Sequence, residues 1–192
     1  TGIYMNPYGR GLIWERPCSM ELMNDPAGGF QANCGIRVRG GYSRSGDNPK
    51  HSFHVYFRGD YGPGTLNYPL YGDAGTGTYN QFDLRTSQNY SWSFGGDGNN
   101  SFLREEFCRQ THVDMGKPDS HVKYVHLYLN GQYWGHYNLR ERVSRYFVAQ
   151  HEGIPLEEAD NMDIIEADDK AYYGSNQEWK ELMKKVKTLD TK

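Results

Sequence analysis

The chain has 192 residues, a formal net charge of −3 at neutral pH and 15% aromatic residues. This length is enough for one ordinary domain with a sizeable core, or for one domain and part of another. The slightly acidic balance argues against a nucleic-acid binder, and no run of about 18 apolar residues predicts a membrane segment. The 16 tyrosines and 23 glycines favour strands and ordered loops over helices.

The two ends of the chain predict that it is a piece of a longer protein. It begins at Thr1 without a methionine or a signal sequence, and it ends at Lys192 without a helix stop. The three cysteines, Cys18, Cys34 and Cys108, lack the spacing of a metal site. We expect the first two in strands and the third in a helix, with buried free thiols favoured over a bridge between the first two.

Three successive strands are predicted over residues 12–23, 30–39 and 53–57, where apolar and polar residues alternate. Pro17 places the first strand at an edge or a bulge, because proline cannot donate a ladder hydrogen bond. The run from Asn24 to Gly29 is a strong turn between the first two strands. The sequence therefore predicts an antiparallel sheet.

The connection between the second and third strands is rich in glycine and cations and reads R-G-G-Y-S-R-S-G-D-N-P-K. Glycines let backbone N–H groups turn toward a ligand, and arginine and lysine supply charge, so an anion such as a phosphate is the natural guest. A hairpin with a solvated loop is the alternative, since a lone glycine-rich pattern is a weak signal. The candidate residues are Gly40, Gly41, Ser43, Arg44 and Lys50.

Residues 58–100 form a long segment with a strand fragment only at 82–85. We expect it to be an ordered loop, because it holds apolar residues able to pack on the core. Those residues are its tyrosines, Leu66, Leu70, Trp92 and Phe94. A helix follows over residues 101–115, with Phe102, Leu103 and Phe107 expected on its buried side.

Residues 122–140 are the clearest hairpin, because Asn130-Gly131 is the preferred two-residue turn. If Leu129 faces Gln132 and the two strands pair regularly, the two residue numbers of every facing pair have the same sum, which we call the constant-sum pairing. The predicted core face then holds Val125, Leu127, Leu129 and Trp134. The other face holds Tyr124, His126, Tyr128, Tyr133 and Tyr137, and such an aromatic face needs a cover or a ligand.

The last third of the chain predicts a helix over residues 142–152, a short strand at 162–165 and a final helix. Ser175 and Glu178 form a capping box for that final helix. Its apolar stripe holds Trp179, Leu182, Met183, Val186 and Leu189, and its lysines form the solvated face. The predicted fold class is α+β, with a strand-rich domain over 1–141 and the truncated, helical start of a second lobe over 142–192.

No metal site or catalytic nucleophile is predicted. His51 and His54 point to opposite faces of a strand, and His126 and His136 fall on opposite faces of the hairpin under the constant-sum pairing. There is no G-x-S-x-G nucleophile motif. The acidic runs at 157–160 and 166–169 lack the spacing of a calcium loop, and we interpret them as solvated loops.

The order of elements is that of a kinase-like small lobe: three strands, a helix, a hairpin, then further helices. Such a lobe needs a strand lysine for the nucleotide phosphates and a helix carboxylate to hold that lysine. Lys50, at the mouth of the third strand, and Glu105 or Glu106, in the helix, are the candidates. The glycine loop departs from ordinary kinases, since it follows the second strand instead of the first.

Motifs in residues 30 to 165 resemble, in order, those of the CotH family of spore coat protein H-like kinases. They are RGGYSRSGDNPKHSF, LNYPLYGD, FDLRTSQNYSW, FLREEFCRQT and LYLNGQYWGHYNLRER. The resemblance implies an atypical protein kinase fold, secreted or at the cell surface of a bacterium, that uses ATP and a divalent cation such as Mg²⁺. Its implied partners are a protein substrate, phosphorylated on serine or threonine, and the rest of the same polypeptide.

The resemblance also implies roles for individual residues. The nucleotide-facing set comprises Arg39, Gly40, Gly41, Ser43, Arg44, Lys50, Glu105 and Glu141. Of the motif residues, Arg104 and Glu141 either line the site or have a structural role. Arg104-Glu105 departs from the family, in which Arg is often followed by Asp or Asn. The family's catalytic and metal-binding aspartates lie in later motifs, so we expect them beyond Lys192, and we expect this piece alone to be inactive and to bind no cofactor tightly. A noncatalytic extracellular binding module using aromatic surfaces is the alternative function.

Overall fold

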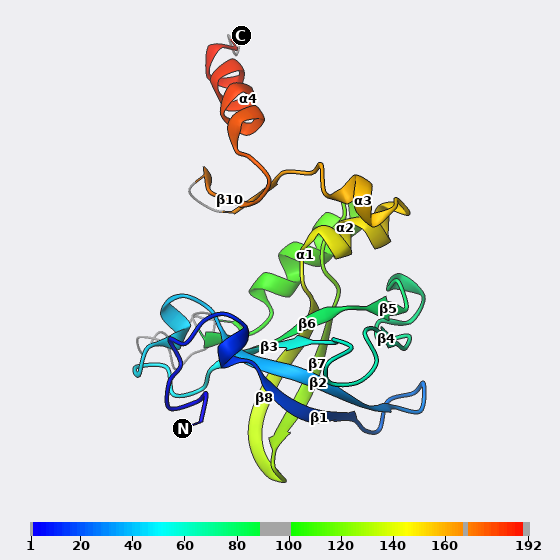
Figure 1. Ribbon diagram of the computed structural model, residues 1–192. Coiled ribbons are helices and arrows are strands. Elements are labelled where there is room, and N and C mark those ends of the chain that lie inside the picture. The colour runs from blue at the N-terminus through cyan, green and yellow to red at the C-terminus, as the bar shows by residue number, and fades with distance from the viewer. Residues whose placement is uncertain (1, 89–100, 167–168, 190–192) are drawn as a thin grey trace. The chain divides into compact units, whose positions relative to one another are not determined.

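A computed structural model describes residues 2–88, 101–166 and 169–189 (Figure 1). The chain divides into two compact units, Thr1–Arg142 and Val143–Lys192, and each is described by itself. Among the helices of the described residues, none is both long and apolar enough to cross a membrane.

The first unit is built on a six-stranded antiparallel sheet with strand order β1-β2-β3-β6-β8-β7. Its strands are β1 Arg16–Leu22, β2 Phe30–Arg39, β3 Ser52–Tyr56, β6 Gln81–Arg85, β7 Val122–Leu129 and β8 Gln132–Glu141. The predicted α+β class with an antiparallel sheet is therefore confirmed. Pro17 does lie in an edge strand of this sheet, but that strand starts later than predicted, because Leu12–Trp14 is a short 3-10 helix, η1.

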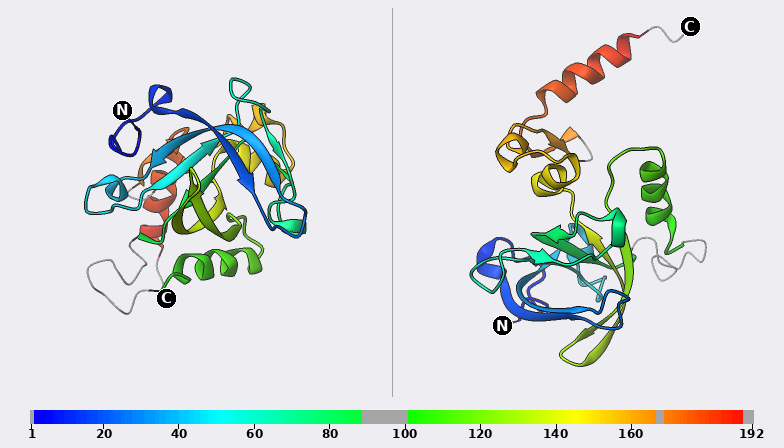
Figure 2. Two further views of the ribbon diagram at one scale, coloured as in Figure 1. Left: turned by 90° about the horizontal axis from the view of Figure 1, so that it is seen from below. Right: turned by 90° about the vertical axis from the view of Figure 1, so that its right-hand side faces the viewer.

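The sheet curls around an apolar core (Figures 1 and 2). Alternate residues of its central strands point to one side, which is the two-residue period of a strand. The buried residues on that side are Val38, Phe53, Val55, Phe82, Leu84, Tyr137 and Leu139. The opposite side of the same strands carries the polar residues that form the candidate site.

The segment after β3 is ordered against this core in its described part, as predicted. It contains the short strands β4 Leu66–Asn67 and β5 Thr78–Tyr79, which pair with each other, and the 3-10 helix η3 Gly72–Ala74. The side chains of Leu66, Tyr68, Leu70 and Tyr79 are buried. The predictions for Trp92 and Phe94 concern residues outside the described ranges.

The helix α1 spans Arg104–Asp114, and the prediction of its buried side was wrong for Leu103 and Phe107, whereas Phe102 is half-buried. Leu103 is 60% exposed and Phe107 is 73% exposed. Polar groups attach this segment to the sheet instead: Glu105 pairs with arginines of two strands, and the Tyr124 hydroxyl donates to the Phe102 carbonyl at 3.1 Å. The helical spacing of Leu103 and Phe107 therefore predicts burial for a face of the helix that is exposed to solvent.

The hairpin of β7 and β8 contains a bulge that the constant-sum pairing misses. Leu129 faces Gln132 as predicted, but the register shifts between Tyr128 and Leu127, so that His126 faces His136 and Val125 faces Tyr137. Tyr137 consequently lies in the core at 1% exposure, not on the outer aromatic face. Val125, Leu127, Leu129 and Trp134 do pack against the core, as predicted.

The same bulge corrects the prediction that His126 and His136 lie on opposite faces. The two residues are direct cross-strand neighbours, and their ring centroids are 5.7 Å apart. Gly135, at the bulge, has a φ of +117°, a conformation that favours glycine.

The described part of the second unit contains three helices and a small antiparallel pair of strands. They are α2 Arg145–Glu152, α3 Leu156–Ala159, β9 Ile164–Ile165, β10 Ala171–Tyr173 and α4 Gln177–Thr188. Ser144 caps α2 by accepting from the Phe147 N–H, and Gly153 ends it in the left-handed conformation. The run at 157–160 was predicted as a loop, but Glu157 and Glu158 lie in α3.

Candidate anion-binding face

The polar side of the sheet carries a row of ionisable residues that face one another across four neighbouring strands. Arg37 of β2 faces His54 of β3, His54 faces Asp83 of β6, and Asp83 faces Arg140 of β8. Because these residues alternate with core residues, the same pattern that builds the core also gathers these charges. We call the cluster the arginine face; its members are Arg37, Arg39, Arg58, Arg85, Arg140, Arg142, Glu15, Asp83 and Glu105.

Asp83 lies at the centre of the arginine face and is 2% exposed. Its Oδ2 atom pairs with Arg39 and lies 3.8 Å from Arg142 Nη1 and 3.9 Å from Arg140 Nε. Its Oδ1 atom lies 3.5 Å from His54 Nδ1. Burial lowers the pKa of His54 to about 3, against the opposing effect of Asp83, so this imidazole is neutral at physiological pH.

Glu105 is the second carboxylate of the face, and it comes from the first turn of α1. It pairs with Arg85, the last residue of β6, and with Arg140 of β8. Arg109 lies one turn further along α1, and its Nη2 atom is 3.0 Å from Glu105 Oε1, the oxygen that Arg140 also contacts. A strand cation is thus held by a helix carboxylate.

The cation in that pair is Arg85, not Lys50. Lys50 Nζ donates to the His136 carbonyl oxygen at 2.8 Å and lies 4.6 Å from the ring centroid of Tyr137. Burial lowers the pKa of Lys50. The prediction that Glu105 or Glu106 holds this lysine was wrong, because Glu105 binds arginines and Glu106 accepts from the side-chain amide of Asn138.

Glu15 is the third carboxylate of the arginine face and pairs with two of its arginines. Its carboxylate lies 3.3 Å from Arg37 Nε and 2.8 Å from Arg58 Nε. Both guanidinium groups also lie over the ring of Tyr56, at 4.2 and 4.6 Å from its centroid. Among the described residues, the six arginines of the face contact its three carboxylates, so cations outnumber anions in the cluster.

The glycine-rich turn beside Arg39 has a conformation that depends on glycine. Gly40 has a φ of +109°, and a Cβ atom there would clash with Ser43 Oγ. The 3-10 helix η2, Tyr42–Arg44, follows directly. Arg44 does not extend toward a ligand: its guanidinium is buried and donates to the carbonyl oxygens of Gly40 and of residues 7 and 9. Arg44 therefore anchors the N-terminal segment to the turn.

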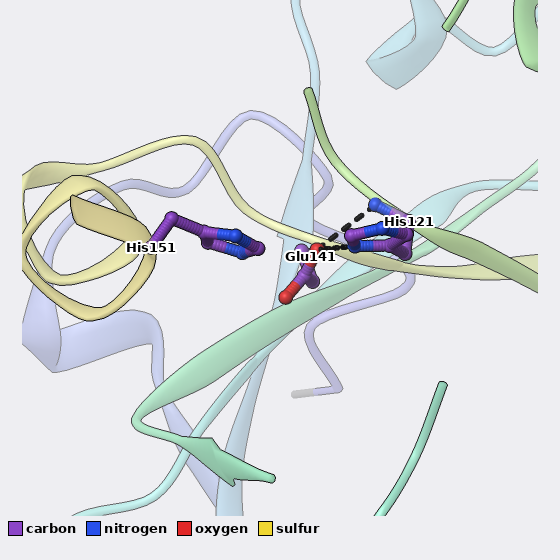
Figure 3. Close-up of side chains that lie close together, drawn as sticks. All are labelled: His121, Glu141 and His151. Atoms are coloured by element: carbon purple, nitrogen blue, oxygen red, sulfur yellow. Dashed lines mark hydrogen bonds and ion pairs between the residues drawn. The ribbon is translucent and has the colours of Figure 1, made fainter. Parts of the chain in front are cut away.

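Glu141 lies on the other side of the sheet, since it faces the core residue Phe82 across the β6–β8 ladder. Its Oε2 atom accepts from the backbone N–H of His121 at 2.9 Å and pairs with His121 Nδ1 at 2.8 Å (Figure 3). The hydrogen bond to Glu141 raises the pKa of His121. Of the residues expected around a nucleotide, the structure brings Arg39 and Glu105 into one charged cluster and places Lys50, Arg44 and Glu141 in other contacts.

Sequence reasoning missed Asp83, Arg85 and Arg140 as site residues. One signal was available for Arg85, because it ends β6, the last strand before α1 in the described residues. Nothing local marks Asp83, whose importance comes from arginines on two other strands and on the segment after β8.

The family comparison covers residues of both units. A model of the family described as CotH kinase protein matches residues 36–192, which include the end of β2 and every later helix and strand of the described residues. The search of curated proteins found no match.

Proposed function

Because this chain belongs to the CotH kinase family, we propose that it forms the nucleotide-binding part of a protein kinase. The observation that carries this proposal is the Arg85–Glu105 pair between β6 and α1. In protein kinases a strand lysine binds the nucleotide phosphates and is positioned by a carboxylate of the following helix. Here arginine takes the place of lysine.

Arginine suits this role because its planar guanidinium can bind two phosphate oxygens at once. Glu105 orients Arg85, and Arg140 links Glu105 to Asp83, so the pair is part of a larger network. We propose that Arg39, at the same end of the sheet and separated from Arg85 by β3, and the backbone of the Gly40–Ser43 turn bind the same ligand. The excess of arginine on this face fits the negative charge of a nucleoside triphosphate.

ATP, bound with a divalent cation such as Mg²⁺, is the proposed ligand, and it supplies the phosphoryl group that a kinase transfers. We propose a protein hydroxyl as the acceptor and a secreted or cell-surface location, both by analogy with the family. In this proposal the arginine face binds and orients the nucleotide. Activation of the acceptor hydroxyl is assigned to residues outside that face.

The test is equilibrium binding of ATP to the 192-residue chain, measured by calorimetry, in the wild type and in Arg85→Gln. Loss of one charge-assisted contact is worth about 1.5–3 kcal/mol, so we expect binding to weaken roughly 10- to 100-fold. Arg10→Gln, the same change at an exposed arginine outside the face, is the matched control and should change Kd less than twofold. Equal affinity of the wild type and Arg85→Gln for ATP, in folded proteins, would refute the proposal.

A noncatalytic binding module is the second candidate, and the tip of the β7–β8 hairpin favours it. Tyr128 and Tyr133 are 53% and 56% exposed, and their ring centroids are 5.3 Å apart. Such paired rings can stack on sugars. Binding of soluble oligosaccharides that is lost in Tyr133→Ala and kept in Arg85→Gln would support this candidate over the kinase.

A further inference from the structure

Cys18 and Cys34 are directly opposite each other on the two strands of the first hairpin. Cys18 lies in β1, Cys34 lies in β2, and the two are partners in the antiparallel register. Their Sγ atoms are 3.4 Å apart. No role in the proposed kinase function involves either residue.

The backbone geometry fits a disulfide without rearrangement of the strands. Directly opposed residues of an antiparallel pair have Cα atoms roughly 4.5 or 5.5 Å apart, depending on their place in the ladder. Both values fall within the range of about 4.4–6.8 Å seen for disulfides. Closing the gap between the sulfurs to a bond needs only a rotation of the side chains, because both already point to the same side of the sheet.

We propose that Cys18 and Cys34 form a cross-strand disulfide that fastens the edge strand β1 to β2. The site belongs to the sheet and does not depend on the nucleotide proposal. β1 needs such a fastening because it is held on one side only, by β2. β1 also directly follows Glu15, which contacts two arginines of the arginine face, so the bridge would secure that end of the face as well.

The two thiols have unequal roles in forming the bond. Cys34 is fully buried and Cys18 is partly exposed, so Cys18 is the residue that an external reagent reaches. The hydrogen bond with Cys34 lowers the pKa of Cys18, and the same contact, together with burial, raises the pKa of Cys34. A thiolate at Cys18 is therefore favoured, and it is the nucleophile of exchange.

The oxidant is a small disulfide such as oxidised glutathione. The Cys18 thiol loses its proton to water, and its sulfur attacks one sulfur of the oxidant, which releases one thiol and leaves a mixed disulfide. The Cys34 thiol then loses its proton and attacks Cys18 Sγ, which releases the second thiol. Two protein thiols are oxidised and one external disulfide is reduced, so atoms and electrons balance.

The first experiment maps disulfides in the full chain after incubation with oxidised glutathione. We expect non-reducing digestion to yield one linked peptide pair containing Cys18 and Cys34, two hydrogens lighter than the two free peptides. Cys108, which is exposed on α1, should be recovered as a free thiol or as a mixed disulfide with glutathione. Free, alkylatable Cys18 and Cys34 after this treatment, or a bridge from either one to Cys108, would overturn the proposal.

The second experiment compares thermal unfolding with and without a reductant. The two cysteines are 16 positions apart, and closing a loop of that size should raise the midpoint by roughly 6–12 °C in a chain of this length. The reductant should remove this gain in the oxidised wild type and in Cys108→Ser. In Cys18→Ala the reductant should change nothing, and because each protein is its own reference, lower stability of that variant does not affect the comparison. A reductant-independent midpoint in the oxidised wild type would contradict the fastening role.

Discussion

Replacing Asp83 by asparagine removes the central negative charge of the arginine face while keeping nearly the same side-chain shape. The carboxylate is 2% exposed and is contacted by Arg39, Arg140 and Arg142. Removing one partner of a buried ion pair typically lowers stability by about 3–5 kcal/mol, because the remaining charge stays buried without compensation. We expect a loss of stability of about 3 kcal/mol, near the lower end of this range. The Arg39 and Arg142 side chains are still 23% and 17% exposed, so water can solvate them in part.

Urea unfolding followed by circular dichroism measures this loss. With a slope of about 2 kcal/mol per molar urea, a loss of about 3 kcal/mol lowers the midpoint by about 1.5 M. Added sulfate should restore part of the stability of Asp83→Asn, because an anion can take the place of the lost carboxylate among the guanidinium groups. The control is Asp73→Asn in η3, where the side chain is exposed, and where we expect a change within about 0.5 kcal/mol.

A loss below about 1 kcal/mol for Asp83→Asn, with an unchanged slope, would refute this reasoning. It would mean that the arginines around position 83 are solvated well enough to need no shared counter-charge. The arginine face would then be an ordinary solvated surface, and its fit to phosphate would lose its physical basis.

Two further predictions concern the glycine-rich turn and the first hairpin. Gly40→Ala should lower the free energy of unfolding by about 1–3 kcal/mol, because φ is +109° and the new Cβ would clash with Ser43. The control is Gly41→Ala, where φ is negative and the space around the glycine is open. In the same urea assay this control should change the free energy of unfolding little. The hydrogen bond from Lys123 lowers the pKa of Asp25 to about 2 from 3.8, so this pair stabilises the fold above about pH 4, and the contribution is lost as the pH falls toward 2. Lys123→Met should make thermal midpoints less dependent on pH between 4 and 2, and an unchanged pH dependence would exclude this pair as its source.

The strands could be predicted because their signals are local. The alternation over Phe30–Arg39 and the Asn130-Gly131 turn each specify geometry within a few residues, and Pro17 marks an edge strand through its own missing N–H. The bulge in β8 could not be derived from the constant-sum pairing. Gly135 was the one local sign, since glycine within a strand often accompanies a bulge.

The candidate site was harder to predict because its contacts depend on strand order. β6 lies between β3 and β8, so Asp83 meets His54 and Arg140 from opposite sides. Alternation shows which face a residue occupies but not which strand lies beside it. The glycine-rich turn before Lys50 predicts it as a phosphate ligand, but its amino group donates a hydrogen bond to a backbone carbonyl of β8 instead.

The attachment of α1 has a consequence for the dynamics of the sheet domain. Phe107 faces solvent, and Glu105 and Glu106 bind the sheet through charge and hydrogen bonds. When such a helix detaches, it exposes little new apolar surface, so local opening is opposed mainly by electrostatic attraction. Dissolved salt weakens that attraction. The amide protons of α1 should therefore exchange with solvent sooner than those of the central strands, and ionic strength should regulate how long the helix stays docked.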